Sequence, residues 1–212
     1  MILGRLNKLK KLGTRKATMA FDGWVVVGLG NLGPTYADTR HNVGYHVTDE
    51  LAQRATARWR PQRSGRLLVA EVRLGPLPGV RALLGRGRCY MNESGGPVSS
   101  LLAGYDVAPD RLVVIHDELD VAYGDLRVKF GGGDNGHNGL KSIRRSLGTG
   151  DYYRVRFGIG RPPGRQDPVD YVLKAFSATE RRELDLHVSR AADAVESLAM
   201  EGLDPTQNRF NG

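Results

Sequence analysis

Two short runs of wholly apolar residues, at 24–27 and 112–115, end abruptly in polar residues. The first run is closed by Gly28, and the second passes directly into His116 and Asp117. Apolar runs of this length, bounded in this way, indicate strands that are buried on both faces of a sheet. Such a sheet must be covered by other elements, which constrains the fold strongly.

Helix signals alternate with these strands. Residues 45–59 carry apolar side chains at the spacing of an amphipathic helix, and the capping box at 177–180 predicts the start of a long one. Further strands are predicted at 67–72, 80–84, 126–130 and 153–159, and further helices at 97–102, stopped by Gly104, and 138–147, stopped by Gly148. The sequence therefore predicts an α/β fold whose sites lie on loops beyond the carboxyl ends of strands.

The size of the chain predicts one domain. With 212 residues and 40% apolar content it can bury one sizeable core. We expect that domain at residues 21–201, followed by a tail at 202–212. The single cysteine, Cys89, excludes an internal disulfide framework and fits a reducing, cytoplasmic compartment. No apolar stretch approaches the roughly 20 residues that span a membrane.

The net charge of +8 is concentrated in the first 20 residues. The rest of the chain is almost balanced, with 25 basic and 23 acidic side chains. Any nucleic-acid surface must therefore come from local clustering of charge. The basic leader, residues 1–20, is open to three interpretations: a targeting segment, a nucleic-acid-binding arm, or a start-site artefact with Met19 as the true initiator. We expect the leader to be disordered or to be the start-site artefact. Its basic residues are Arg5, Lys8, Lys10, Lys11, Arg15 and Lys16.

Five short polar segments, which we call polar islands, carry the candidate catalytic and binding residues. Asparagine is disfavoured inside helices and strands, so Gly/Asn islands next to histidine predict loops that aim side chains. Imidazole, carboxylate and amide groups suit a water-activating hydrolase; there is no thiol nucleophile motif, metal-ligand spacing or Gly-Lys-Ser/Thr phosphate loop. The islands are Gly28-Leu-Gly-Asn31-Leu-Gly33, Thr39-Arg-His41-Asn42, Tyr90-Met-Asn92-Glu-Ser-Gly95, His116-Asp117-Glu118-Leu-Asp120 and Gly136-His137-Asn138-Gly139.

His41 and Asp117 are the predicted acid–base pair. A histidine base needs a partner on its other ring nitrogen, and Asp117 ends a core strand. His116 is a competing base, but strand alternation directs it away from the Asp117 side of the sheet. Asn92 and Asn138 offer neutral amides that can hold a carbonyl oxygen or a water, although each could also be an ordinary cap or turn residue.

Two glycine-rich segments suggest ligands. Residues 28–33 match the Gly-x-Gly-x-x-Gly dinucleotide fingerprint, but no helix signal or acidic residue follows at the required place. Residues 131–136 lead into a predicted helix and form a candidate anion site beside Lys129, Lys141 and Arg156. An exposed face of solvated charges is the alternative, and we take the arginines at 54–66 as such a surface.

Six ordered motifs together resemble the bacterial-type peptidyl-tRNA hydrolase family, from about residue 24 to residue 201. They are Val27-Gly-Leu-Gly-Asn31, Tyr36-x-x-Thr-Arg-His41-Asn-x-Gly44, Tyr90-Met-Asn92-x-Ser-Gly95, His116-Asp-Glu-Leu-Asp120, Gly136-His-Asn-Gly-Leu-Lys141 and Arg156-Phe-Gly-Ile-Gly160. The resemblance implies one α/β domain with a twisted mixed sheet flanked by helices on both faces. It also implies cleavage of the ester between a peptide and the terminal ribose of tRNA.

The resemblance further implies roles for individual residues. By it, His41 activates water, Asp117 orients His41, Asn31 and Asn92 hold the peptide and the adjoining ester, and Asn138 positions water or substrate. Tyr36, Met91 and His137 would support the pocket, and Lys129, Lys141 and Arg156 would receive a tRNA phosphate. No metal, organic cofactor or stable protein partner is implied, and a monomer is expected. Asp134 and Asn135 depart from the usual pattern. The alternative from another class is a non-catalytic RNA-binding relative similar to chloroplast intron-splicing factors.

Overall fold

A computed structural model describes residues 21–212 of the chain. The basic leader at 1–20, with its three interpretations, lies outside the described residues. Among the residues that are described, no helix combines the length and the apolar composition needed to cross a bilayer.

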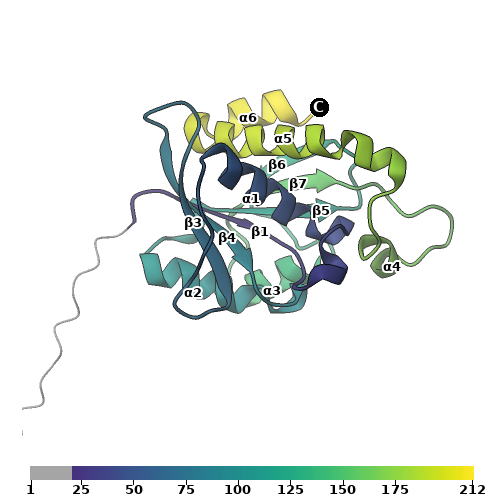
Figure 1. Ribbon diagram of the computed structural model, residues 1–212, viewed down its shortest axis with the longest axis horizontal. Coiled ribbons are helices and arrows are strands. Elements are labelled where there is room, and N and C mark those ends of the chain that lie inside the picture. The colour runs from purple at the N-terminus through teal and green to yellow at the C-terminus, as the bar shows by residue number, and fades with distance from the viewer. Residues whose placement is uncertain (1–20) are drawn as a thin grey trace, which may run out of the picture.

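Seven strands form one mixed sheet in the order β2-β3-β4-β1-β5-β7-β6 (Figure 1). The four neighbouring strands β4, β1, β5 and β7 run parallel. The outer strands β3 and β6 pair antiparallel with β4 and β7, and β2 pairs antiparallel with β3. The strands are β1 (Trp24–Gly28), β2 (Arg60–Pro61), β3 (Leu67–Leu74), β4 (Val80–Gly87), β5 (Leu112–Glu118), β6 (Leu126–Phe130) and β7 (Tyr153–Gly158).

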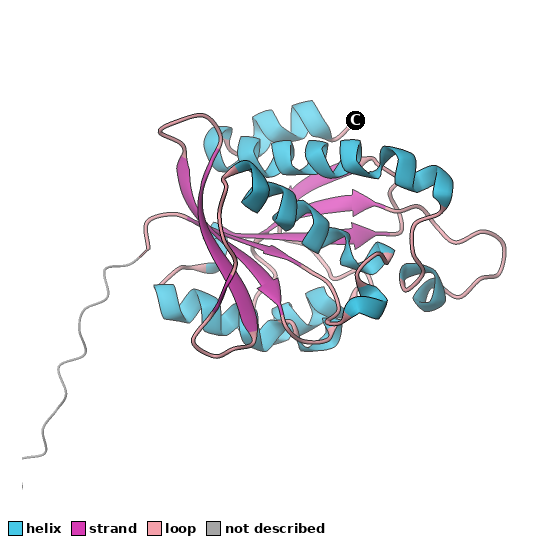
Figure 2. Ribbon diagram, viewed as in Figure 1, coloured by secondary structure: helices cyan, strands magenta, loops and turns pink. Residues whose placement is uncertain are grey.

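Helices cover both faces of the sheet, as Figure 2 shows, and each face has its own apolar core. Helices α1, α5 and α6 lie on one face, and α2 and α3 pack together on the other. This arrangement confirms the predicted single α/β domain. The helices are α1 (Val43–Arg54), α2 (Gly95–Tyr105), α3 (Asn138–Leu147), α4 (Pro168–Val172), α5 (Ala178–Glu201) and α6 (Leu203–Phe210); the short 3-10 turns are η1 (Pro34–Tyr36), η2 (Arg40–Asn42), η3 (Met91–Glu93) and η4 (Pro109–Arg111).

The two apolar runs are the central strands β1 and β5, and every residue of both is buried. They are neighbours in parallel register, with Val27 opposite Val114. Their carboxyl ends therefore meet at one edge of the sheet, next to the end of β4. The polar islands that follow these three strands are brought together by this topology alone.

Two glycines allow the first helix to approach this edge closely. A Cβ on Gly28 would collide with the carbonyl of Gly44, and a Cβ on Gly44 would lie 2.5 Å from the carbonyl oxygen of Ile115. The start of α1 therefore lies against the ends of β1 and β5. The 3-10 turn η2, which carries His41, comes directly before this contact.

Two predicted helix ends are wrong. The helix expected over 45–59 ends at Arg54, because Thr56 takes a left-handed conformation (φ 50°). Trp59 nevertheless packs against the core, which extended the apolar spacing beyond the helix. Gly104 lies inside α2, and the helix ends instead at Asp106, whose left-handed φ of 55° makes the cap.

The segment at 202–212 is not a tail. It forms α6, which packs against β6 and α5. Phe210 is buried in the core, and Asn211 Oδ1 accepts a hydrogen bond from the amide of Val128 at 2.6 Å. The sequence prediction missed this helix because its apolar side is short. The catalytic domain expected at 21–201 therefore extends through α6.

Candidate active site

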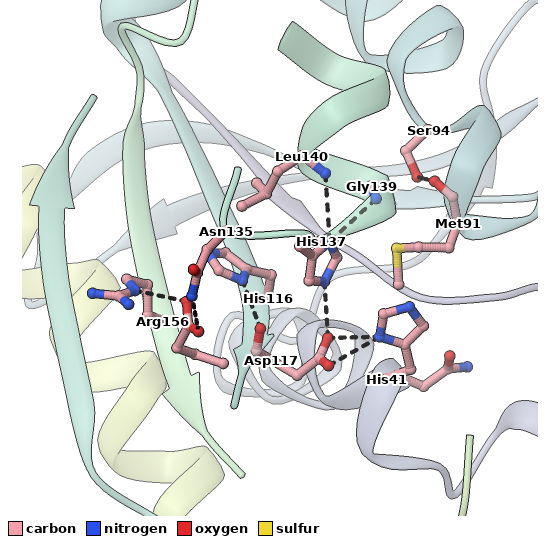
Figure 3. Close-up of polar contacts among 12 residues, drawn as sticks. His41, Met91, Ser94, His116, Asp117, Asn135, His137, Gly139, Leu140 and Arg156 are labelled. Atoms are coloured by element: carbon pink, nitrogen blue, oxygen red, sulfur yellow. Dashed lines mark hydrogen bonds and ion pairs between the residues drawn. The ribbon is translucent and has the colours of Figure 1, made fainter. Parts of the chain in front are cut away.

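A cleft of about 440 Å³ opens at the carboxyl ends of β1 and β5. Its polar residues include four asparagines, two histidines and a buried aspartate, several of which are drawn in Figure 3. The lining residues are Asn31, His41, Met91, Asn92, Asp117, Glu118, Leu119, Asn135, Gly136, His137, Asn138, Pro168, Val169, Val172 and Leu173.

His41 and Asp117 form the pair that the sequence predicts. His41 Nδ1 lies 2.9 Å from both carboxylate oxygens of Asp117. Because the carboxylate is an acceptor, Nδ1 carries the proton and Nε2 keeps its lone pair. Nε2 makes no hydrogen bond with the described residues, and the ring lines the cleft. His41 is therefore arranged as a base that can take a proton from a molecule in the cleft.

Arg40 holds the turn that carries His41. Its guanidinium donates to the carbonyl oxygens of Lys174 and Ala175, at 3.3 and 2.9 Å. It also pairs with Glu180 at 2.6 Å and stacks over the ring of Tyr171. The η2 turn is thus tied to the segment that leads into α5. The sequence analysis did not assign this role, because the contacts span about 135 residues.

The electrostatics of the pair favour a charged Asp117 and a basic His41. Burial acts against the ionised form of Asp117, but the neighbouring His41 and His137 outweigh it and hold the pKa of the carboxyl well below its usual range. Burial would also lower the pKa of His41, and the charge and hydrogen bond of Asp117 reverse that effect and raise it. A higher pKa makes the neutral imidazole a stronger base.

His137 shares the same carboxylate. Its Nε2 lies 3.0 Å from Asp117 Oδ1, an oxygen that His41 also contacts, and the two imidazole rings are neighbours with centres 4.9 Å apart (Figure 3). Its Nδ1 accepts hydrogen bonds from the amides of Gly139 and Leu140, so His137 is the N-cap of α3. The sequence analysis considered Asn138 as the cap; the imidazole nitrogen takes that place because it reaches the free amides of the first turn.

His116 does not act on the carboxylate. Its Nδ1 donates to the backbone oxygen of Asp117 at 2.7 Å, and its ring contacts His137 edge to face. Full burial lowers its pKa to about 3, so the ring stays neutral. This placement agrees with the strand alternation that directed His116 away from the carboxylate.

A metal ion at this cluster is disfavoured by the hydrogen bonds of His137. The ligand atoms of His41, Asp117 and His137 lie within 4.8 Å of one another, which is close enough to surround an ion. However, His137 Nδ1 already accepts two backbone amides, so Nε2 must carry the proton. Coordination through Nε2 would require the loss of that proton or of the helix cap. The cluster suits proton transfer better than metal binding.

Asn31 is fixed by a neighbour that the sequence analysis did not single out. The side chain of Asn42 exchanges two hydrogen bonds with the backbone of Asn31, at 2.8 and 3.0 Å. Asn31 Oδ1 accepts from the amide of Met91 at 2.8 Å. The remaining amide group, Nδ2, has no partner among the described residues and belongs to a residue that lines the cleft. Asn31 therefore presents a hydrogen-bond donor in a set orientation.

The other predicted substrate residues are placed unequally. Met91, Asn92 and Asn138 line the cleft, with Met91 buried and both asparagines exposed. Tyr36 lies outside the lining residues and contacts the exposed Tyr90 edge to face, with ring centres 6.4 Å apart. Tyr36 therefore stands at a distance from the acid–base pair.

The apolar wall of the cleft was missed. It is formed by Pro168, Val169, Val172 and Leu173, of which Val169 is 59% exposed. The first three lie on α4, a helix of five residues that is too short to show a period. A signal was present in Asp167-Pro168, since Asp167 caps the helix and proline opens it.

Two of the three predicted phosphate residues lie together. Lys129 and Arg156 stand on paired strands, β6 and β7, and on the same face of the sheet. Partial burial and the charge of Arg156 lower the pKa of Lys129. Lys141 is exposed on α3, and its charge is not among those that act on Lys129.

The Gly-x-Gly-x-x-Gly segment lacks the structure of a dinucleotide site. Two 3-10 turns follow Gly33, and the first α-helix begins only at Val43. No α-helix therefore opens directly from the glycine turn, among the described residues, as that fingerprint requires. The turn instead presents Asn31.

Comparison with known proteins agrees with the resemblance. The family model for peptidyl-tRNA hydrolase matches residues 25–212. The peptidyl-tRNA hydrolase of Frankia alni is 58% identical over 188 residues, covering 89% of this chain and 93% of that protein. That of Streptomyces coelicolor is 56% identical over 191 residues, covering 89% and 94%.

A solved structure shows the same fold. The crystal structure of peptidyl-tRNA hydrolase from Acinetobacter baumannii superposes with a TM-score of 0.81 at 30% identity, covering 91% of this chain and 96% of that one. The match extends over the sheet and both helical layers. The chain therefore belongs to the peptidyl-tRNA hydrolase family.

Proposed function

We propose that the protein hydrolyses the ester bond between a peptide, or an N-blocked aminoacyl group, and the terminal ribose of tRNA. Such a reaction releases free tRNA from products of aborted translation. The observation that carries the proposal is the His41–Asp117 pair, at 2.9 Å, in a cleft that Asn31, Asn92 and Asn138 also line. Membership of the family supports the substrate.

In this mechanism a water molecule is the nucleophile. His41 Nε2 takes a proton from the water as it attacks the ester carbonyl, and Asp117 stabilises the imidazolium that forms. When the tetrahedral intermediate collapses, the bond from the carbonyl carbon to the ribose oxygen breaks, and the imidazolium returns its proton to that oxygen. An ester has a better leaving group than an amide, so an activated water suffices and no covalent intermediate is needed. General-base catalysis contributes about 10²- to 10⁴-fold to such a step.

Asparagine amides hold the reacting groups. The free Nδ2 of Asn31 is placed to donate to a carbonyl oxygen of the substrate, which becomes more negative during attack. Asn92 and Asn138 contact the peptide, the ribose or the water. Tyr36 and Met91 support this region from outside and inside the cleft, and His137 fixes the second side of Asp117.

The body of the tRNA is held by charge. Lys129 and Arg156 form the phosphate site, with Lys141 as a further contact from α3. Contacts of this kind weaken as salt concentration rises, because they release counterions. We infer that the protein works as a monomer in the cytoplasm, in keeping with its single free cysteine, Cys89; light scattering in solution tests the first point.

The test is hydrolysis of N-acetyl-aminoacyl-tRNA by the wild type and by His41→Ala. We expect release of tRNA by the wild type and a loss of at least about 10²-fold in the variant, with unchanged thermal melting. Comparable activity in both proteins would refute the base assignment. Binding of tRNA without cleavage by either would favour the non-catalytic RNA-binding relative.

A further inference from the structure

Asn135 links the glycine-rich loop to two carboxylates at the end of β5. Its Nδ2 donates to Glu118 Oε1 at 2.7 Å and to Asp120 Oδ2 at 2.9 Å. Both amide hydrogens are thereby used, which fixes the orientation of the side chain. The backbone of Asn135 is left-handed, with φ 48°, a conformation that asparagine tolerates better than most residues.

The hydrogen bond from Asn135 determines which oxygen of Glu118 is left to bind Arg156. Glu118 is buried. Its Oε1 accepts from Asn135 and, at 3.4 Å, from the backbone amide of Asp120, and its Oε2 accepts from Arg156 Nε at 2.9 Å. The two terminal Nη groups of Arg156 make no hydrogen bond with the described residues. Arg156 is therefore held by one bond and keeps donors for another ligand.

Without Asn135, the two oxygens of Glu118 would no longer be divided between Asn135 and Arg156. Oε1 would keep only the long bond from the Asp120 amide, and a carboxylate whose second oxygen is available pairs with guanidinium in a bidentate fork, which is the preferred geometry. Glu118 is already within bonding distance of Arg156, so only a rotation of its carboxylate is needed. This bidentate pairing would occupy an Nη group of Arg156 and neutralise more of the positive charge of its guanidinium.

We propose that Asn135 is a positioning residue that keeps Arg156 available to a tRNA phosphate by occupying Glu118 Oε1. This inference rests on the proposed function of Arg156. It assigns a role to a loop position where the chain departs from the usual family pattern. The role is one of substrate affinity, because Asn135 acts through Glu118 and Arg156 and does not contact His41 or Asp117.

The primary variant is Asn135→Gly, since glycine accepts the left-handed backbone and removes only the side chain. Kinetics are measured on N-acetyl-aminoacyl-tRNA and on the same N-acetyl-aminoacyl ester of adenosine, which lacks the tRNA body. We expect KM for the tRNA substrate to rise roughly two- to fivefold, the range of a partly exposed ion pair. The kcat values and the KM for the short ester should stay unchanged, and the salt dependence of KM should weaken.

Three variants sharpen the test. Asn135→Asp replaces the donor with a third carboxylate, so its effect on KM for tRNA should be at least as large. In a Glu118→Gln background, Asn135→Gly should have no further effect, because glutamine lacks the charge that captures Arg156. Asn208→Ala, an exposed asparagine on α6, is the matched control and should change nothing.

An equal rise of KM on both substrates, a fall in kcat on the short ester, or failure of both Asn135 variants to fold would overturn the proposal and make Asn135 a general support of the loop. Arg156→Ala tests the phosphate site separately from the positioning role of Asn135. If Arg156→Ala raises KM for tRNA and Asn135→Gly does not, the phosphate site stands and the inference fails. If Arg156→Ala has no effect on KM, the phosphate site itself is wrong.

Discussion

On the cleft side of the site, Asp117 and His41 are buried and bonded to each other, whereas on a second side, outside the cleft lining, Lys129 and Arg156 are partly exposed. Asp117 accepts hydrogen bonds from two imidazoles. Arg156, by contrast, is held by one hydrogen bond to Glu118, and Lys129 has no ion pair among the described residues. On the first side, the side chains of Asp117 and His41 are therefore held in position before any substrate binds.

This difference separates chemistry from recognition. Buried hydrogen bonds act in a medium of low dielectric constant, where small changes of geometry alter the reaction barrier strongly. Exposed charges are screened by solvent and salt, so each contributes little alone. We therefore expect large, salt-independent effects on kcat from the first side and small, salt-dependent effects on KM from the second.

The largest effect should come from Asp117→Asn. The amide stabilises the wrong tautomer of His41, and we expect kcat to fall by about 10³- to 10⁴-fold. The variant also loses the charge that raises the pKa of His41, while burial, which lowers it, remains. The acid limb of the pH profile of kcat/KM should therefore move to lower pH. An unchanged rate or a shift to higher pH would remove Asp117 from its role.

Asn42→Ala should show how far preorganisation extends beyond the acid–base pair. It removes both hydrogen bonds that hold the backbone of Asn31. Displacement of a catalytic group by about 1 Å can cost up to about 10²-fold, so we expect a loss of about 10- to 100-fold in kcat on either substrate. Single-turnover assays at two salt concentrations should give the same loss. A salt-dependent loss would place Asn42 with the recognition residues.

The double variant Lys129→Ala, Arg156→Ala should mark the other side of the comparison. We expect KM for the tRNA substrate to rise by about 5- to 25-fold, as two weak charge contacts allow, with a shallower salt dependence. The short adenosine ester should be cleaved with unchanged kinetics. If both substrates are affected equally, the division between the two sides is wrong.

The smallest effect should separate the two roles of His137. Asparagine is a good helix cap but is shorter than imidazole, so His137→Asn should retain the cap and lose the bond to Asp117. His137→Ala loses both. Denaturant unfolding should find the alanine variant less stable by about 1 kcal/mol, whereas the two variants should share the same activity. Equal stabilities would show that capping is not a function of His137.

The sequence predicted most of the fold for an identifiable reason. Buried strands and amphipathic helices are periodic, and the capping box at Ser177 and the stop at Gly148 are local signals that the structure confirms. Errors occurred where local signals were weak or ambiguous. The helix over 45–59 ended early at a left-handed threonine, and α6 was taken as a tail.

The candidate site divides in the same way. The meeting of His41, Asp117 and Asn31 followed from residue chemistry and from the ends of neighbouring strands, and the structure brings them together. It also places Tyr36 outside the cleft lining and Lys141 in an exposed position on α3. Those two placements depend on where a short turn and a helix dock, which no residue pattern records.

By itself, the sequence determined the fold class, because apolar periodicity is written in consecutive residues, and the family, because six ordered motifs carry the resemblance; it also predicted the His41–Asp117 pair. Only the tertiary structure decided that one carboxylate serves two histidines, that Asn42 fixes Asn31, and that Asn135 and Arg156 bind different oxygens of Glu118. Each of these is a contact between residues 11 to 76 positions apart. Such contacts are set by the packing of whole elements, which fixes distances and orientations that spacing along the chain does not.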